Sequence, residues 1–177
     1  MRGVSSDVKA KIQEYRAEAR LIRAWYYWMA MDVFGAVPFA TENTAFGAKA
    51  PEQKPREYIY EYIVDELEDL ASDSSALPAA RSNYPRVDKG SALGLLARIY
   101  LNAEVYSGTA QWELAKSTCE RIFNLGYGLS SNYAALFRGD NGENPEALKE
   151  FLMAVPFDSH KQQSYGGTTF LVLASQN

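Results

Sequence analysis

The stretch EYRAEARLIRAWYYWMAMDVF, Glu14 to Phe34, decides the fold because its apolar residues recur at every third or fourth position. They form two neighbouring stripes: Ala17, Leu21, Ala24, Trp28, Met31 and Phe34 in one, and Ile22, Trp25, Met29 and Val33 in the other. Fully burying one such large side chain is worth roughly 1.5–3 kcal/mol, so burial must hold this helix. We therefore expect a central helix with neighbours on at least two sides.

The two ends of this helix also carry signals. Gly35 is expected to end it as a left-handed cap. Asp7 is expected to cap an earlier helical run, which continues into the central helix with a break near Gln13. The central helix is thus preceded by a more polar one.

Composition is ordinary for a globular protein and excludes some functions. The chain has 177 residues, 47% of them apolar and 23% charged, which suits one domain with a proper core. A net charge of -4 argues against a general nucleic-acid or anionic-membrane surface. Aromatic residues reach 13%, with twelve Tyr, which suits half-buried seams and, less often, sugar-facing surfaces.

Three further helices are expected, each with a buried stripe. Their spans are Arg56 to about Ser72, Asp88 to about Val105, and Thr109 to about Asn124, with Pro55 before the first and with Asp88 and Thr109 as caps. The inward residues are Ile59, Ile63, Leu67 and Leu70 in the first; Ala92, Leu95, Leu96, Ile99 and Ala103 in the second; and Trp112, Ala115, Cys119, Ile122 and Phe123 in the third. The acidic run from Asp65 to Asp69 is expected to be a solvated face.

The last two of these helices are joined by a short turn, which predicts an antiparallel hairpin. Leu93-Gly94, Tyr100, Ala115 and Ile122 match positions of a tetratricopeptide unit, although its closing Pro is missing. Small residues at Gly94 and Ala97 are expected to let another helix approach closely, and Gly126 is expected to stop the second helix.

Beyond Gly126 the helical period fades. One helical turn is expected at 132–137, a loop at 139–145, and strands at Lys149–Val155 and Thr168–Ala174. The predicted fold is mainly α, with tetratricopeptide-like helical hairpins in an α-α superhelix and a small C-terminal β element. We expect a single domain over 1–177, with hairpins over about 7–126 and the irregular and β segment over about 127–177.

Catalytic and metal-binding patterns are weak. The single histidine, His160, and the single cysteine, Cys119, have no second His or Cys at metal-ligand spacing. The segment from Gly139 to Asn144 resembles a calcium loop but has the wrong spacing. No Gly-x-Ser-x-Gly elbow surrounds any serine. We assign no catalytic residue, no metal ligand and no cofactor.

Several motifs together resemble the SusD/RagB family of glycan-binding outer-membrane lipoproteins. They occur in the family's order, and together they cover nearly the whole chain: Arg16–Trp28, Asp32–Phe39, Tyr60–Leu70, Arg86–Ala92, Leu96–Ala103, Asn132–Phe137 and Gln163–Leu171. The last of these is similar to a strand of the branch closest to the starch-binding member.

This resemblance implies a function and a location. It implies binding, without cleavage, of an oligosaccharide or polysaccharide such as starch, and delivery to a SusC-like TonB-dependent transporter at the outer face of the outer membrane. The chain would then be an internal fragment, with its export signal and lipidated cysteine upstream, so that Cys119 is not the lipid anchor. The family's aromatic arc for sugar lies outside this stretch, so the ligand-binding residues stay unassigned.

Local candidates for ligand contact are few. Trp25, Trp28 and Trp112 have the spacing of core residues, which favours packing over sugar contact. The loop from Ala40 to Lys54, with Asn43 and Phe46, is the best local candidate for a surface contact, although a plain loop is the simpler interpretation. Arg98 is expected to pair with a carboxylate between hairpins.

Two other functions stay open. One is a helical-repeat scaffold that binds a protein or peptide and no glycan. The other is a helical glycoside hydrolase, which would need two carboxylates roughly 5–9.5 Å apart in an apolar cleft.

Overall fold

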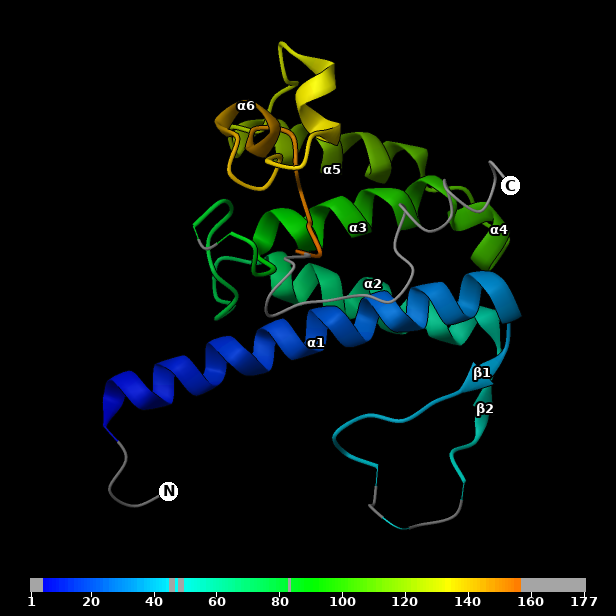
Figure 1. Cartoon of the computed structure of the whole chain (residues 1–177). Helices are drawn as coiled ribbons and strands as arrows, with labels where there is room; N and C mark the ends of the chain where they lie inside the picture. Colours follow the sequence, from blue (N-terminus) through cyan, green and yellow to red (C-terminus); the bar gives the residue numbers. More distant parts are fainter. Residues whose placement is uncertain (1–4, 45–46, 48–49, 83, 157–177) are drawn as a thin grey trace, which may run out of the picture.

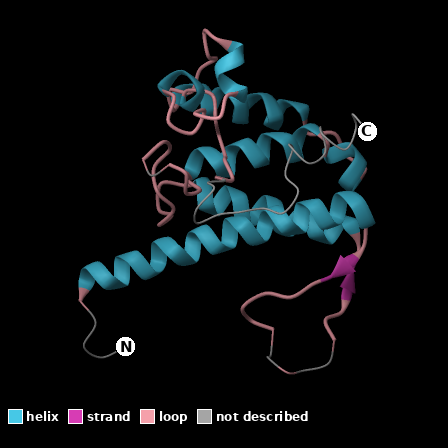
Figure 2. Ribbon diagram, in the orientation of Figure 1, coloured by secondary structure: helices cyan, strands magenta, loops and turns pink. Residues whose placement is uncertain are grey.

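The computed structural model describes residues 5–44, 47, 50–82 and 84–156. Its elements are α1 (Ser6–Phe34), β1 (Val37–Pro38), β2 (Gln53–Lys54), α2 (Arg56–Ala71), α3 (Lys89–Leu101), α4 (Ala103–Ser107), α5 (Trp112–Asn124), the 3-10 helix η1 (Tyr133–Phe137) and α6 (Pro145–Leu148). The helices α1, α2, α3 and α5 stack in succession (Figure 1), and Figure 2 shows that β1 and β2 form a short antiparallel ladder at one end of α1. The expected mainly α fold of helical hairpins is confirmed.

Helix α1 is longer and more regular than expected. It has 29 residues, which corresponds to about 43 Å. Ser5 is its cap and accepts a hydrogen bond from the backbone N–H of Val8, so the predictions of an Asp7 cap and of a break near Gln13 are wrong. Gly35 follows with φ 74° and ψ −97°, which is a positive φ but not the left-handed helical conformation. Within this fold that conformation occurs at Gly108, after α4.

The first predicted stripe of α1 faces the core except at its last residue, and the second is half-buried in its first half and exposed in its second half. Ala17, Leu21, Ala24 and Met31 are buried against α2, as expected. Phe34 is 76% exposed and Val33 is 70% exposed, so the apolar side chains at the end of α1 face solvent. The prediction that Phe34 is buried with the first stripe is therefore wrong.

The seam between α1 and α2 is polar at its rim. Arg20 of α1 contacts Glu66 at 2.8 Å and Asp69 at 2.9 Å, and Arg23 contacts Glu66 at 3.2 Å. The acidic run 65–69 is therefore not merely a solvated face. Arg23 also binds Glu42, which ties the β1–β2 loop to α1.

Helices α2 and α3 bury the stripes that the sequence predicts. All nine of their expected inward residues are buried: Ile59, Ile63, Leu67, Leu70, Ala92, Leu95, Leu96, Ile99 and, just beyond α3, Ala103. Asp88 caps α3 with a reciprocal capping box to Ser91. Asn102 separates α3 from α4, so the predicted helix to Val105 is broken there.

Helix α5 forms the expected antiparallel hairpin with α3, but two predictions about it are wrong. Its cap is Gln111, two residues after Thr109. Trp112 and Phe123 are 62% and 70% exposed, while Ala115 and Ile122 are buried. Only the small and aliphatic members of the expected stripe therefore reach α3.

The segment after α6 differs most from expectation. Residues 149–156 are neither helix nor strand, so the predicted strand at Lys149–Val155 is wrong. The second predicted strand, Thr168–Ala174, lies outside the described residues. None of the described helices combines the length and the apolarity that a membrane crossing requires.

Candidate functional site

The tryptophans of α1 serve packing, as their spacing predicts. Trp25 and Trp28 are partly buried against the core. The indole N–H of Trp28 donates to the Tyr106 hydroxyl at 3.3 Å, and that hydroxyl donates to Asp32 at 2.8 Å. Arg98 lies over the Trp28 ring, 5.5 Å from its centroid, so it stacks on an aromatic ring. Among the described residues it does not form the expected pair with a carboxylate.

The loop between β1 and β2 is tied down at its start. The Tyr27 hydroxyl both donates to the carbonyl of Ala40 and accepts from its N–H, at 2.7 Å each. The Phe39 ring packs on the Tyr27 ring at a centroid distance of 5.1 Å. Asn43 is exposed and donates its backbone N–H to Thr41, while Phe46 lies outside the described residues. The residues with known placement thus make an anchored loop without an aromatic platform.

Metal chemistry finds no support in the part of the chain that the structure describes. There, no three His, Cys, Asp or Glu side chains gather closely enough to hold a metal ion. Cys119 is half-buried on α5, and His160 lies outside the described residues.

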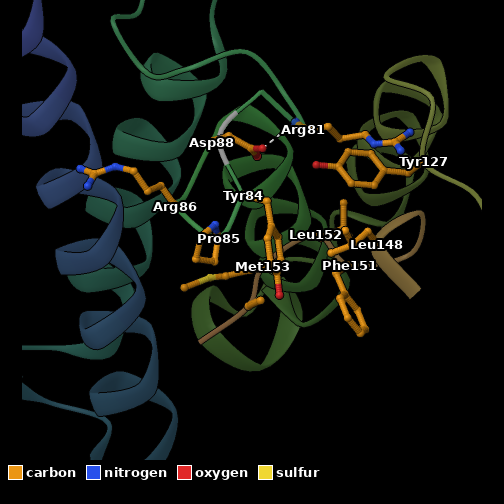
Figure 3. Close-up of a pocket in the computed structure, with 11 residues that line it drawn as sticks. Arg81, Tyr84, Pro85, Arg86, Asp88, Tyr127, Leu148, Phe151, Leu152 and Met153 are labelled. Carbon is orange, nitrogen blue, oxygen red and sulfur yellow. Dashed lines mark hydrogen bonds between the residues drawn. The ribbon is translucent and has the colours of Figure 1, made fainter. Parts of the chain in front are cut away.

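A hollow that sequence reasoning missed lies where the linker before α3 meets the segment after α6. We call it the Tyr84 cleft. Tyr84, Phe151, Met153 and Ala154 line both of its parts. The inner part, of about 150 Å³, also has Arg81, Asp88 and Tyr127 in its wall (Figure 3). The outer part, of about 870 Å³, adds Leu136 and the turn from Gly139 to Glu143.

The first wall of the cleft is built on the cap of α3. Arg81 has a φ of 62°, and its backbone N–H donates to Asp88 at 2.7 Å. The other carboxylate oxygen of Asp88 accepts from the N–H of Ser91 at 2.9 Å. The Arg81 guanidinium donates to the carbonyl of Gly126 at 2.6 Å. The linker that carries Tyr84 is therefore held through Arg81, by Asp88 on one side and by Gly126 on the other.

The second wall depends on two glycines of α3. A Cβ at Gly90 would lie 2.1 Å from the Tyr127 hydroxyl, and one at Gly94 would lie 3.1 Å from Leu152. The Ser91 hydroxyl adds a hydrogen bond to the carbonyl of Leu152 at 2.7 Å. Gly94 thus admits a non-helical segment, not the helix that the sequence predicts. Burial raises the pKa of Tyr127 to about 12, so its phenol stays protonated at neutral pH.

The third wall is the turn before α6. The side-chain amide of Asn141 donates to the carbonyl of Leu136 at 2.8 Å, and the carbonyl of Asp140 accepts from the N–H groups of Glu143 and Asn144 at 3.0 Å each. A Cβ at Gly142 would lie 3.2 Å from the Tyr84 hydroxyl, so a glycine there lets the ring approach. Tyr84 itself is 41% exposed.

A second hollow follows the outer face of α1, and we call it the α1 groove. Its floor is Ile22, Trp25, Tyr26 and Met29, and the stretch Met153–Pro156 lies opposite. Its volume is about 810 Å³, and Tyr26 is 68% exposed. Arg86 closes one side: it pairs with the buried carboxylate of Glu18 and is turned toward α1 in Figure 3.

The sequence held signals for the Tyr84 cleft, but they were not distinctive. Tyr84 is the one aromatic residue in a linker of small and polar residues, and the turn 139–144 carries two acids and two amides. Only the fold shows that residues this far apart share one hollow.

Comparison with known proteins gives the family. Residues 2–101 match a family model, SusD-like, described as "Starch-binding associating with outer membrane". The chain is 34% identical over 167 residues to the starch-binding protein SusD of Bacteroides thetaiotaomicron. The aligned stretch covers 94% of this chain and 29% of that protein.

Solved structures agree on the fold. Surface glycan-binding protein A of Bacteroides uniformis is 25% identical, with a TM-score of 0.63 over 81% of this chain and 30% of its own. A SusD-like protein of Bacteroides fragilis is 20% identical, with a TM-score of 0.68 over 90% of this chain and 30% of its own. The chain thus spans less than a third of the length of each of these relatives. It belongs to the SusD-like family.

Proposed function

We propose that this chain is the helical scaffold of a protein that binds an oligosaccharide or polysaccharide, such as starch, at the outer face of the outer membrane. The observation that carries the proposal is the 34% identity, across 94% of the chain, to a protein named for starch binding. The protein is held there by a lipid anchor outside this stretch. It passes its ligand to a SusC-like TonB-dependent transporter.

The proposed role is binding without cleavage. The named relatives are a starch-binding and a glycan-binding protein. A glycosidase needs a carboxylic acid whose pKa is raised toward neutral pH. The hydrogen bond from Arg23 instead lowers the pKa of Glu42 to about 2, and the hydrogen bond from Lys149 lowers the pKa of Glu146 to about 2. Both groups are thus suited to ion pairing and not to proton donation.

Calorimetric titration of the full-length protein tests this function. The titrants are a panel of oligosaccharides that begins with maltooligosaccharides, and the same mixtures are analysed for new reducing ends. We expect heat of binding with at least one sugar and no new reducing ends. New reducing ends would overturn the claim of a non-catalytic role, and no binding across the panel would overturn glycan capture.

The partner needs a separate test. The full-length protein, affinity-tagged and expressed in its native cell, is expected to co-purify with a TonB-dependent transporter after detergent extraction. Recovery without any transporter would contradict delivery while leaving sugar binding intact.

The α1 groove favours one alternative, an interaction scaffold without glycan binding. Its exposed Tyr26 and Met29 form an apolar face of the kind that contacts other protein surfaces. The two functions differ in the calorimetric result, because a pure scaffold gives no heat with any sugar.

A further inference from the structure

We infer that the outer part of the Tyr84 cleft is a glycan contact site, formed by the rings of Tyr84 and Phe151 and by the polar turn from Asp140 to Glu143. This inference rests on the proposed function and deepens it, because it assigns contact residues within this chain.

The shape of the outer part suits a small ligand. Its volume of about 870 Å³ falls within the range of roughly 300–1,000 Å³ that is usual for ligand sites. Its walls are also fixed. Backbone hydrogen bonds hold the 139–144 turn itself. The segments that carry Tyr84 and Phe151 are held just beside the outer part, by the Asp88 network and by the contact of Leu152 with Gly94. A fixed cleft loses little conformational entropy when it binds.

The polar groups of the cleft divide into occupied and available ones. In the inner part, Arg81 is bonded to Gly126, and Asp88 accepts from Arg81 and Ser91. Arg86, at the edge, is paired with Glu18. In the outer part, the carboxylates of Asp140 and Glu143 make no hydrogen bond or ion pair within residues 5–44, 47, 50–82 and 84–156. The acceptors available to a ligand therefore lie in the outer part.

These acceptors suit hydroxyl groups. A carboxylate accepts hydrogen bonds and donates none, so it pairs with a ligand rich in O–H donors. The outer part is lined by two carboxylates and, among the described residues, by no lysine or arginine, so like-charge repulsion disfavours phosphate and other anions there. A neutral polyol satisfies both conditions, and an oligosaccharide is such a ligand.

The aromatic wall adds the second half of sugar recognition. The C–H face of a pyranose ring packs against an aromatic face, while its hydroxyl groups point outward to polar partners. Tyr84 and Phe151 extend in the same direction in Figure 3, and both line the outer part. Tyr84 is 41% exposed, so its ring is accessible to a ligand. Aromatic rings and hydroxyl acceptors thus meet in one cleft.

The test uses the full-length protein and the sugar of the panel that it binds most tightly, beginning with maltoheptaose. We expect Tyr84→Ala to weaken binding by about tenfold and Asp140→Asn by about threefold. Tyr84→Phe keeps the ring and is expected to bind within about twofold of the wild type. Tyr133→Ala is the control, because Tyr133 is 73% exposed on η1 and does not line the cleft.

Melting curves separate lost contact from lost fold. Both weakened variants are expected to melt at the temperature of the wild type. If Tyr84→Ala melts early, the affinity of Asp140→Asn decides the test, because that change keeps the size of the side chain. Unchanged affinity in both Tyr84→Ala and Asp140→Asn, with binding by the wild type intact, would overturn this inference alone. If the wild type bound no sugar of the panel, both the inference and the proposed function would be overturned.

Discussion

The described chain has two regions that are built in different ways. We call the helical region that ends with α5 the periodic half, and the shorter region 127–156 the irregular half. In α2 and α3, apolar residues recur with the helical period and disappear into one core. In residues 127–156, only short helices form, and single contacts attach the segment to α3: Tyr127 at Gly90, Leu152 at Gly94, and the Ser91–Leu152 hydrogen bond. The first kind of structure provides stability. The second leaves polar groups exposed and shapes a cleft, as is common for segments that bind ligands.

The largest expected effect is in the periodic half. Leu67→Ala removes a side chain with no exposed surface, so we expect it to lower the free energy of unfolding by about 2–5 kcal/mol through lost burial and a cavity. Leu101→Ala is the matched control, because Leu101 is 61% exposed, and it is expected to cost about 0.5 kcal/mol or less. Equal losses in urea denaturation would contradict the assignment of this core.

The next effect is at the attachment of the irregular half. Gly94→Val places side-chain atoms where Leu152 packs, so we expect a loss of about 1–3 kcal/mol in unfolding free energy. Adding Leu152→Ala is expected to return part of that loss, because it clears the space. Gly128→Ala is the control, since nothing lies within 4 Å of its added Cβ. If the losses of unfolding free energy from Gly94→Val and Leu152→Ala simply add in the double mutant, the two residues do not touch.

A smaller effect is expected at the joint between the halves. Asp88→Ala removes the cap of α3 and the acceptor of the Arg81 N–H, so we expect a loss of about 1–2 kcal/mol. Ser5→Ala removes an exposed cap with a 3.4 Å hydrogen bond and is expected to cost only about 0.5 kcal/mol. Thermal unfolding of the two variants measures both losses of stability. A larger loss for Ser5→Ala than for Asp88→Ala would contradict this prediction.

The smallest effect depends on pH and concerns the β1–β2 loop. The pKa of Glu42 is about 2 in the folded chain because Arg23 donates to its carboxylate, whereas an unfolded Glu titrates near about 4.3. Because the folded pKa is the lower one, this stabilisation is present above about pH 4.3 and is lost as the pH falls to about 2. The Glu42 side chain is 41% exposed, so the free energy involved is below about 1 kcal/mol.

The measurement compares wild type with Glu42→Gln by urea unfolding at neutral and acidic pH. The difference in their unfolding free energies is expected to shrink as the pH falls below the pKa of a Glu in the unfolded chain. Glu52→Gln is the control, because Glu52 is 78% exposed and pairs with Lys54, only two residues away. If the difference in unfolding free energy between wild type and Glu42→Gln grew as the pH fell, the result would contradict this ion pair.

Sequence predicted the periodic half well, for a physical reason. The burial of Ile59, Ile63 and Leu67 follows from spacing alone, because a helix places residues three and four apart on one face. Spacing could not tell that Phe34 and Phe123 are exposed, since that depends on which other elements cover each face of the helix. Short apolar runs such as 149–155 can be strand or coil, and here the run is neither helix nor strand and packs Leu152 on Gly94.

The candidate site could not be predicted from the sequence, for a related reason. The turn from Asp140 to Glu143 and the ring of Tyr84 are more than fifty residues apart, and they meet through contacts that have no periodic signature. Most of the motifs that gave the family lie in or next to α1, α2 and α3, the helices that form the core. The cleft is defined by side chains between and after the helices.

Hydrogen–deuterium exchange of the full-length protein, with and without the glycan that calorimetry selects, tests the central claim most directly. The claim is that helices support a glycan contact in the irregular half. We predict slower exchange with glycan in residues 139–144 and 151–155, and unchanged exchange in α2. Slowing confined to the helices, or no slowing anywhere in this chain while glycan is bound, would contradict it.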